Sequence, residues 1–116
     1  MSELIKAVRP LAGTILALTL FQGVAGWELT QGSDYGHEHT AYLLTVLAIA
    51  LPAVVIKSGI DDKSVKGNSF AVAGIVVIQL LVGLFLMGSY GWIHIPLAMI
   101  LAAHSFAVLI SMRHVE

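Results

Sequence analysis

The sequence predicts an all-α fold, a four-transmembrane-helix antiparallel bundle that forms a single domain over residues 1–116. Hydrophobic residues make up 58% of the chain and charged residues only 11%, whereas a typical soluble domain has about half and about a quarter. A chain of 116 residues has too high a surface-to-volume ratio to bury so much apolar surface in water. Lipid is therefore the expected solvent for much of its surface.

Four apolar runs account for the predicted helices, and short polar segments separate them. The runs are residues 11–27, 40–56, 70–87 and 92–112. Each run is close to the length of about 20 residues that a helix needs to cross a bilayer. Pro10 stands directly before the first run, at a position where a helix tolerates a missing N–H group. The connecting segments are rich in Gly, Ser or charged residues. Segments 28–39 and 57–68 are expected to be loops, and segment 88–91 a tight connection.

The basic residues determine the predicted orientation. If the four spans alternate in direction, all Lys and Arg residues fall on one side of the membrane. They are Lys6, Arg9, Lys57, Lys63, Lys66 and Arg113. Because basic residues are retained on the cytoplasmic side, we expect an integral protein of the cell membrane with both termini in the cytoplasm. Aromatic residues would then gather at the outer interface, namely Trp27, Tyr35, Tyr90 and Trp92.

Three histidines are expected at similar depth near the outer face. His37 and His39 precede the second run and His94 begins the fourth, and these two runs are parallel if the spans alternate. Neutral imidazole is the commonest protein metal ligand, and two imidazoles from facing helices can bind haem iron axially. His37 and His94 are each followed four residues later by alanine, which leaves space for a porphyrin plane one turn along the helix. We therefore expect His37 and His94 to hold the metal of a b-type haem, with His39 as the reserve cofactor ligand.

The histidines also have simpler interpretations. His39 fits a solvated loop residue, and His94 fits a polar residue at the membrane interface. His104 lies well inside the fourth run, where a polar group is costly in lipid and usually faces other helices. We expect His104 to have a structural role, with a hydrogen bond to Ser105, Gln79 or a backbone carbonyl.

The outer acids leave several roles open, and the composition excludes others. Glu28, Asp34 and Glu38 could each orient a ligating imidazole, belong to a proton path or be solvated loop residues. The chain has no cysteine, which excludes disulfides, thiolate metal sites and covalent haem attachment. A net charge of −1 excludes binding of nucleic acid by charge alone. The chain also has no phosphate-binding glycine loop and no His-Glu-x-x-His motif.

Residues 34–41, Asp-Tyr-Gly-His-Glu-His-Thr-Ala, resemble the Glu-x-x-His-Arg-x-x-Gly pattern of the haem A synthase family, which is built from four-helix units. Residues 79–83, Gln-Leu-Leu-Val-Gly, are similar to the Gln-x-x-x-Gly motif of that family, and His94 is similar to the histidine of its fourth helix. The resemblance covers nearly the whole chain and implies a compact, half-length member. It implies bis-histidine haem ligation by His37 and His94, and a catalytic role for Asp34 in the oxidation of a haem substituent.

Four features depart from the family pattern. Asp34 stands at the position of the glutamate, Glu38 at that of the arginine and Ala41 at that of the glycine. The first outer segment also lacks the cysteine pair of many bacterial members.

The function expected from these observations is that of a membrane haem-binding protein in haem modification or electron transfer, and hence an oxidoreductase. The alternative is a non-enzymatic accessory subunit of a larger, respiratory-type membrane complex, since short loops and many small residues suit packing against partner helices. A third hypothesis is a metal or proton relay through His37, His39 and the outer acids. Glycine-rich helix faces also permit a homodimer.

Overall fold

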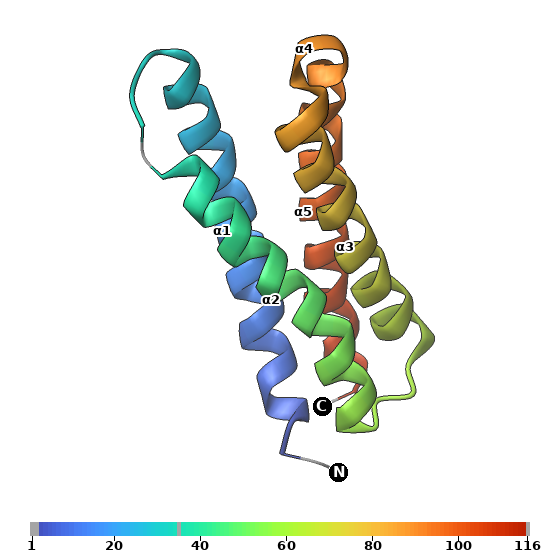
Figure 1. Cartoon of the computed structure of the whole chain (residues 1–116). Coiled ribbons are helices and arrows are strands. Elements are labelled where there is room, and N and C mark those ends of the chain that lie inside the picture. The colour runs from blue at the N-terminus through green and yellow to red at the C-terminus, as the bar shows by residue number, and fades with distance from the viewer. Residues whose placement is uncertain (1–2, 35, 116) are drawn as a thin grey trace.

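The computed structural model describes residues 3–34 and 36–115, and all regular structure in this part of the chain is helical. Figure 1 shows the long helices, which are α1 (Ile5–Thr30), α2 (His37–Ser58), α3 (Lys63–Leu81) and α5 (His94–Ser111). Shorter elements follow α3 and α5, namely η1 (Val82–Leu86), α4 (Met87–Tyr90), η2 (Gly91–Ile93) and η3 (Met112–His114). The prediction of an all-α fold is confirmed for the described residues.

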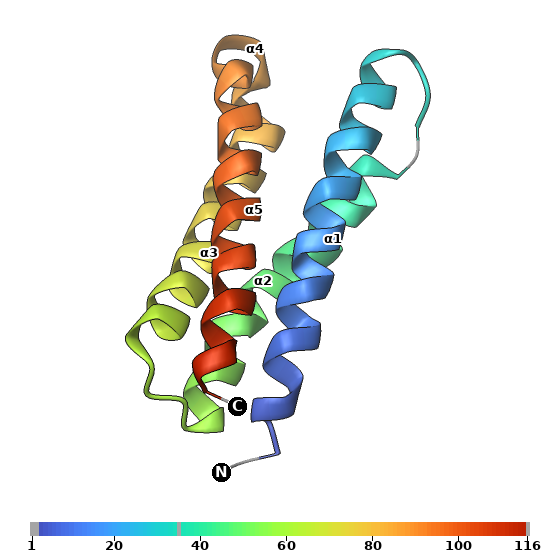
Figure 2. The same cartoon turned by 180° about the vertical axis from the view of Figure 1, so that it is seen from behind.

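Among these residues, three helical stretches are long and apolar enough to cross a membrane. They are α1, α2 and the stretch Lys63–His114. The last stretch is helical throughout, yet it reverses direction at α4, so that α5 returns alongside α3 (Figures 1 and 2). Residues 88–91 thus make the predicted tight connection between antiparallel helices, and they do so in helical conformation. The reversal is made by helical segments of altered winding, a π-helix in η1 and a 3₁₀-helix in η2.

The first two helices begin earlier than the apolar runs. α1 begins at Ile5, so Pro10 lies inside the helix rather than at its start. Pro10 is exposed, and its carbonyl accepts a hydrogen bond from the Thr14 hydroxyl at 2.8 Å. α2 begins at His37, preceded by Gly36 with a φ of 83°, a conformation that glycine adopts without strain. The first turn of α2 therefore contains the two histidines that were expected in a loop.

Charged residues after α2 also belong to a helix. Gly59, with a φ of 83°, ends α2. Asp62 then caps α3 because its carboxylate accepts the N–H of Val65 at 3.0 Å. The cap starts the helix at Lys63, seven positions before the apolar run, and shortens the predicted loop 57–68 to the residues between Ser58 and Lys63.

The helices form two antiparallel hairpins, α1 with α2 and α3 with α5. α1 packs against α2 and α5, and α3 packs against the same two helices. The start of α1 and the end of α5 lie at the same end of the molecule, and the hairpins diverge toward the opposite end (Figures 1 and 2). The core fills the half near the chain ends, with completely buried side chains that include Val8, Ala12, Ile15, Ala48, Leu51, Val55, Val65, Val72, Val108 and Met112.

Large apolar side chains also cover the outside of the molecule. Phe85 is 74% exposed, Trp92 72% and Ile95 69%. Water disfavours so much exposed apolar surface, whereas lipid accepts it. Trp27, Tyr90 and Trp92 lie at the end opposite the basic residues, while Tyr35 is outside the described part of the chain.

The core makes a direct prediction about stability. Leu51 is completely buried, whereas Ile49 on the same helix is 48% exposed. We expect Leu51→Ala to lower the free energy of unfolding by about 2–5 kcal/mol, because it leaves a cavity among packed helices. Ile49→Ala should cost less than about 1 kcal/mol. Unfolding in detergent micelles by a denaturing surfactant measures both, and equal losses would contradict this placement of the core.

Candidate cofactor site

A cavity of about 840 Å³ lies between the two hairpins, beyond the core and away from the chain ends. Its volume is within the range of about 300–1,000 Å³ that is typical of small-molecule and cofactor sites. The wall is mostly apolar and carries a few polar side chains, as cofactor sites do. They are Thr19, Gln22, Thr30, His37, Glu38, Tyr42, Thr45, Gln79 and His94.

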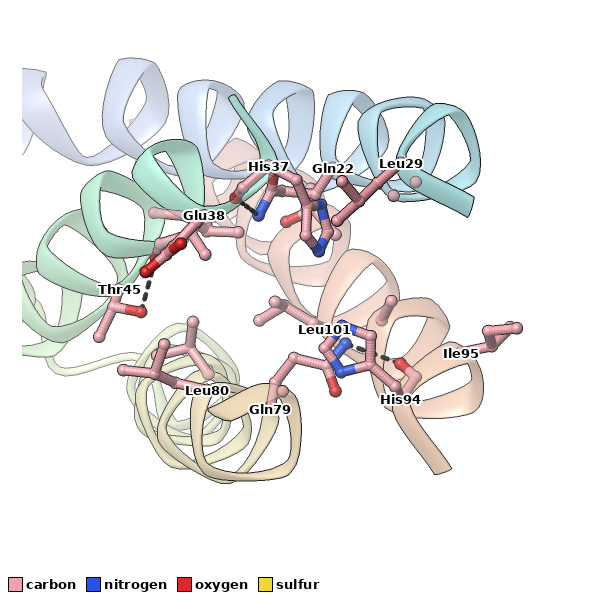
Figure 3. A pocket seen from close by; sticks show the side chains of 18 of the residues that line it. Gln22, Leu29, His37, Glu38, Thr45, Gln79, Leu80, His94, Ile95 and Leu101 are labelled. Carbon is pink, nitrogen blue, oxygen red and sulfur yellow. Dashed lines mark hydrogen bonds between the residues drawn. The ribbon is translucent and has the colours of Figure 1, made fainter. Parts of the chain in front are cut away.

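His37 and His94 face each other across this cavity. The two ring centroids are 6.2 Å apart, and the ring planes make an angle of 71°. Figure 3 shows the imidazoles pointing toward one another from opposite walls, His37 from α2 and His94 from α5. The helices thus bring together the pair of histidines that the alanine spacing favoured.

Each ring lies over a glycine of its own hairpin. A Cβ atom on Gly26 would be 3.1 Å from Cε1 of His37, and a Cβ atom on Gly83 would be 3.4 Å from Cε1 of His94. A side chain at position 26 would crowd the His37 ring, whereas one at position 83 would just reach contact distance of the His94 ring. Gly26 therefore allows the close approach of the His37 ring to α1.

Each histidine is also held through its backbone by a glutamine. Nε2 of Gln22 donates to the carbonyl oxygen of His37 at 2.9 Å, and Nε2 of Gln79 donates to that of His94 at 2.7 Å. These bonds join the start of the second helix of each hairpin to the first helix. They fix the position of each histidine along the first helix of its hairpin.

Four polar atoms at this site are buried and have no hydrogen-bond partner within the described chain. They are Oε1 of Gln22, Nδ1 of His37, Oε1 of Gln79 and Nδ1 of His94. Buried polar atoms normally have a partner, and exceptions often mark a functional site or a group that binds there. The four atoms form two matching sets, one in each hairpin.

The match reflects an internal repeat. The pattern Gln-x₃-Gly-x₁₀-His-x₃-Ala-x₂-Leu occurs at residues 22–44 and again, 57 positions later, at residues 79–101. The same offset relates completely buried core residues, as in Val8 and Val65, Ala12 and Ser69, Ile15 and Val72, Ala48 and Ser105, Leu51 and Val108, and Val55 and Met112. The helix contacts follow the same relation: α1 packs against α2 as α3 packs against α5, and α2 packs against α3 as α5 packs against α1. The two hairpins are thus related by approximate twofold symmetry.

Other residues that were expected at the site lie elsewhere. His39 is exposed and does not line the cavity. Asp34 is exposed as well, lies outside the lining, and accepts the N–H of Gly36 at 2.8 Å in the turn before α2. Glu28 is half-buried and also outside the lining, whereas Glu38 lines the cavity and accepts a hydrogen bond from Tyr42 at 3.1 Å. The catalytic role of Asp34 stays a prediction.

His104 has a structural partner, but a different one from those expected. Its Nδ1 is 2.7 Å from Oδ1 of Asn68, which links α5 to α3 outside the cavity lining. Asn68 also donates to the carbonyl oxygen of Ser64 at 2.8 Å, and the hydroxyls of Ser64 and Ser111 are 2.7 Å apart. This polar network joins the two helices of the second hairpin.

No group of three or more His, Asp and Glu side chains gathers as a metal site in the residues that the structure describes. A pair of axial imidazoles does not need such a group, because the other ligands of haem iron come from the porphyrin. Comparison of the chain with protein-family models, with curated proteins and with solved structures gives no match. The interpretation of the site therefore rests on its own geometry.

Gln22, Gly26 and Tyr42 are site residues that the sequence analysis did not single out. The first two carry a signal, since the 57-residue offset places them opposite Gln79 and Gly83. Tyr42 has no counterpart of this kind, because Met99 stands at the equivalent position.

The glycine contacts are testable without any cofactor. Alanine normally stabilises a helix interior relative to glycine by roughly 1 kcal/mol. Gly13→Ala in α1 should show this gain because nothing lies within 4 Å of the added Cβ atom. Gly26→Ala should lose it, because the new methyl group would be 3.1 Å from the His37 ring. Unfolding curves in detergent compare the two variants, and an equal gain in both would show that the ring does not lie against Gly26.

Proposed function

We propose that this chain is an integral membrane protein with four spans and cytoplasmic termini, and that it binds one b-type haem between His37 and His94 for electron transfer. The single observation that carries the proposal is the approach of these two imidazoles in a cavity of cofactor size. The four-span topology is supported by the reversal within Lys63–His114. The orientation is supported by the basic residues, which lie at the start of α1, the end of α2, the start of α3 and in η3.

The spacing of the two rings fits a single metal ion between them. With metal–nitrogen bonds of about 2.0–2.1 Å and each nitrogen about 1.1 Å from its ring centroid, two axial imidazoles have centroids about 6.3 Å apart. The rings of His37 and His94 have centroids 6.2 Å apart. This spacing of the rings therefore supports ligation of one metal ion between them.

The surroundings of the rings also fit a flat cofactor. Gly26 and Gly83 carry no side chain beside the imidazoles. Ala41 and Ala98, one helical turn after each histidine, place only a methyl group in the cavity wall. A ligating imidazole binds through one nitrogen and carries a proton on the other, which needs an acceptor. The amide oxygens of Gln22 and Gln79 are unpartnered acceptors in the same hairpins as the unpartnered Nδ1 atoms.

A haem held by His37 and His94 would supply one-electron chemistry, because its iron can be ferric or ferrous. His37 and His94 would hold it within a mostly apolar wall, and the helices set the distance between the two rings. Membership of the haem A synthase family and oxidation of a haem substituent by way of Asp34 are part of the proposal, supported only by the resemblance. Electron transfer is the better supported activity, since Asp34 lies outside the cavity lining.

Absorption spectroscopy of the purified, haem-supplemented protein tests this function. The native protein should give the Soret and α/β bands of a low-spin, six-coordinate haem. His37→Ala and His94→Ala should each abolish the low-spin spectrum, because each removes one axial ligand. His39→Ala is the matched control and should leave the spectrum unchanged, since His39 does not line the cavity.

Three results would contradict the proposal. The absence of a Soret band would remove haem binding altogether, and co-purification in a stoichiometric complex without haem would favour an accessory subunit instead. Loss of the low-spin spectrum in His39→Ala but not in His37→Ala would show that His39, and not His37, is the ligand.

A further inference from the structure

Most of the cavity wall consists of pairs of residues related by the 57-residue offset. The stripe that carries each histidine is identical in the two hairpins, as positions i, i+4 and i+7 of α2 and α5. It consists of His37, Ala41 and Leu44 in the first hairpin and of His94, Ala98 and Leu101 in the second. The part of the wall that faces the two rings is thus symmetric.

The neighbouring stripe is not symmetric. In α2 it consists of Glu38, Tyr42 and Thr45, whereas in α5 it consists of Ile95, Met99 and Ala102. All six side chains line the cavity. Two further pairs follow the same trend, Thr19 of α1 with Val76 of α3 and Thr30 of α1 with Met87 of α4. At each of these five positions of the described lining, the polar residue is in the first hairpin.

The two stripes lie on opposite sides of the imidazole pair. Figure 3 shows Glu38 and Thr45 on one side of the rings and Ile95 on the other. The hydroxyl of Tyr42 donates to Oε1 of Glu38 at 3.1 Å, and the hydroxyl of Thr45 donates to the carbonyl oxygen of Ala41 at 2.8 Å. With these donors in use, the polar stripe presents mainly acceptors, above all the Glu38 carboxylate.

A flat ligand between the histidines meets the same axial groups in either of two orientations, which differ by a half turn about the approximate twofold axis. Its two lateral edges meet different walls, one with a carboxylate and one purely apolar. A carboxylate binds a donor strongly and repels another anion. The asymmetry of the wall therefore acts on the orientation of the ligand and not on its axial ligation.

We propose that the stripe Glu38, Tyr42 and Thr45 is a specificity subsite that selects one orientation of a tetrapyrrole with unequal edges. The edge that bears a hydrogen-bond donor, such as a hydroxyalkyl group, lies against α2, and the apolar edge lies against Ile95 and Met99 of α5. This inference rests on the proposed haem binding. A charge-assisted hydrogen bond made in only one orientation favours that orientation roughly tenfold.

Proton NMR of the ferric low-spin protein tests the subsite, because each haem orientation gives its own set of shifted ring-methyl resonances. The probe is a b-type haem in which one vinyl group is replaced by a hydroxyethyl group. The native protein should show one set in roughly tenfold excess. The triple variant Glu38→Ile, Tyr42→Met, Thr45→Ala makes the two stripes identical and should bring the two sets to near equality.

A second variant tests the subsite by changing α5 instead of α2. Ile95→Glu, Met99→Tyr, Ala102→Thr places the polar stripe in both hairpins and should also equalise the two sets. The control is Leu43→Ile with Val46→Ala, at α2 positions that are 51% and 64% exposed and outside the cavity lining, and it should keep the native ratio. A native excess that persists in both symmetrised variants would overturn the subsite while leaving haem binding intact. A native protein that binds no haem would overturn the proposed function itself.

Discussion

Two imidazole rings approach each other between the hairpins with centroids 6.2 Å apart, and the surrounding structure depends on that approach. Gly26 and Gly83 carry no side chain beside the rings, and the amides of Gln22 and Gln79 hold the backbone of each histidine. Polar rings in an apolar wall are costly without partners. The unpartnered Nδ1 and Oε1 atoms therefore support the proposal that the site binds an occupant.

The repeat explains how so small a chain forms such a site. Each hairpin supplies one histidine, one glycine and one glutamine, and the core beside the chain ends holds the hairpins together with residues that follow the same 57-residue offset. Packing of Ile15, Leu51, Val72 and Val108 closes one half of the molecule, while the hairpins diverge around the cavity in the other half. Symmetry thus provides matched histidines, and the departures from symmetry at Glu38, Tyr42 and Thr45 distinguish one side of the cavity from the other.

The sequence was sufficient for the class of fold and for part of the site. Apolar runs of nearly membrane-spanning length predicted helices, and the alanine four residues after His37 and His94 identified the pair that faces the cavity. Helix ends were predicted less well, because they depend on local hydrogen bonds such as the Asp62 cap, which starts α3 among charged residues. The partner of His104 was missed because Asn68 lies in a segment that was predicted to be a loop. Asn68 is instead part of α3, which begins at Lys63, and from there its side chain reaches His104 on α5.

Electron paramagnetic resonance of the ferric, haem-loaded protein tests the central claim most directly, since it reports the axial ligands and the relative orientation of their planes. The ring planes of His37 and His94 make an angle of 71°. We predict a strongly anisotropic low-spin signal, the kind that nearly perpendicular axial imidazoles give, and its loss in either His37→Ala or His94→Ala. A high-spin signal in the native protein, or a low-spin signal that survives both substitutions, would contradict the account.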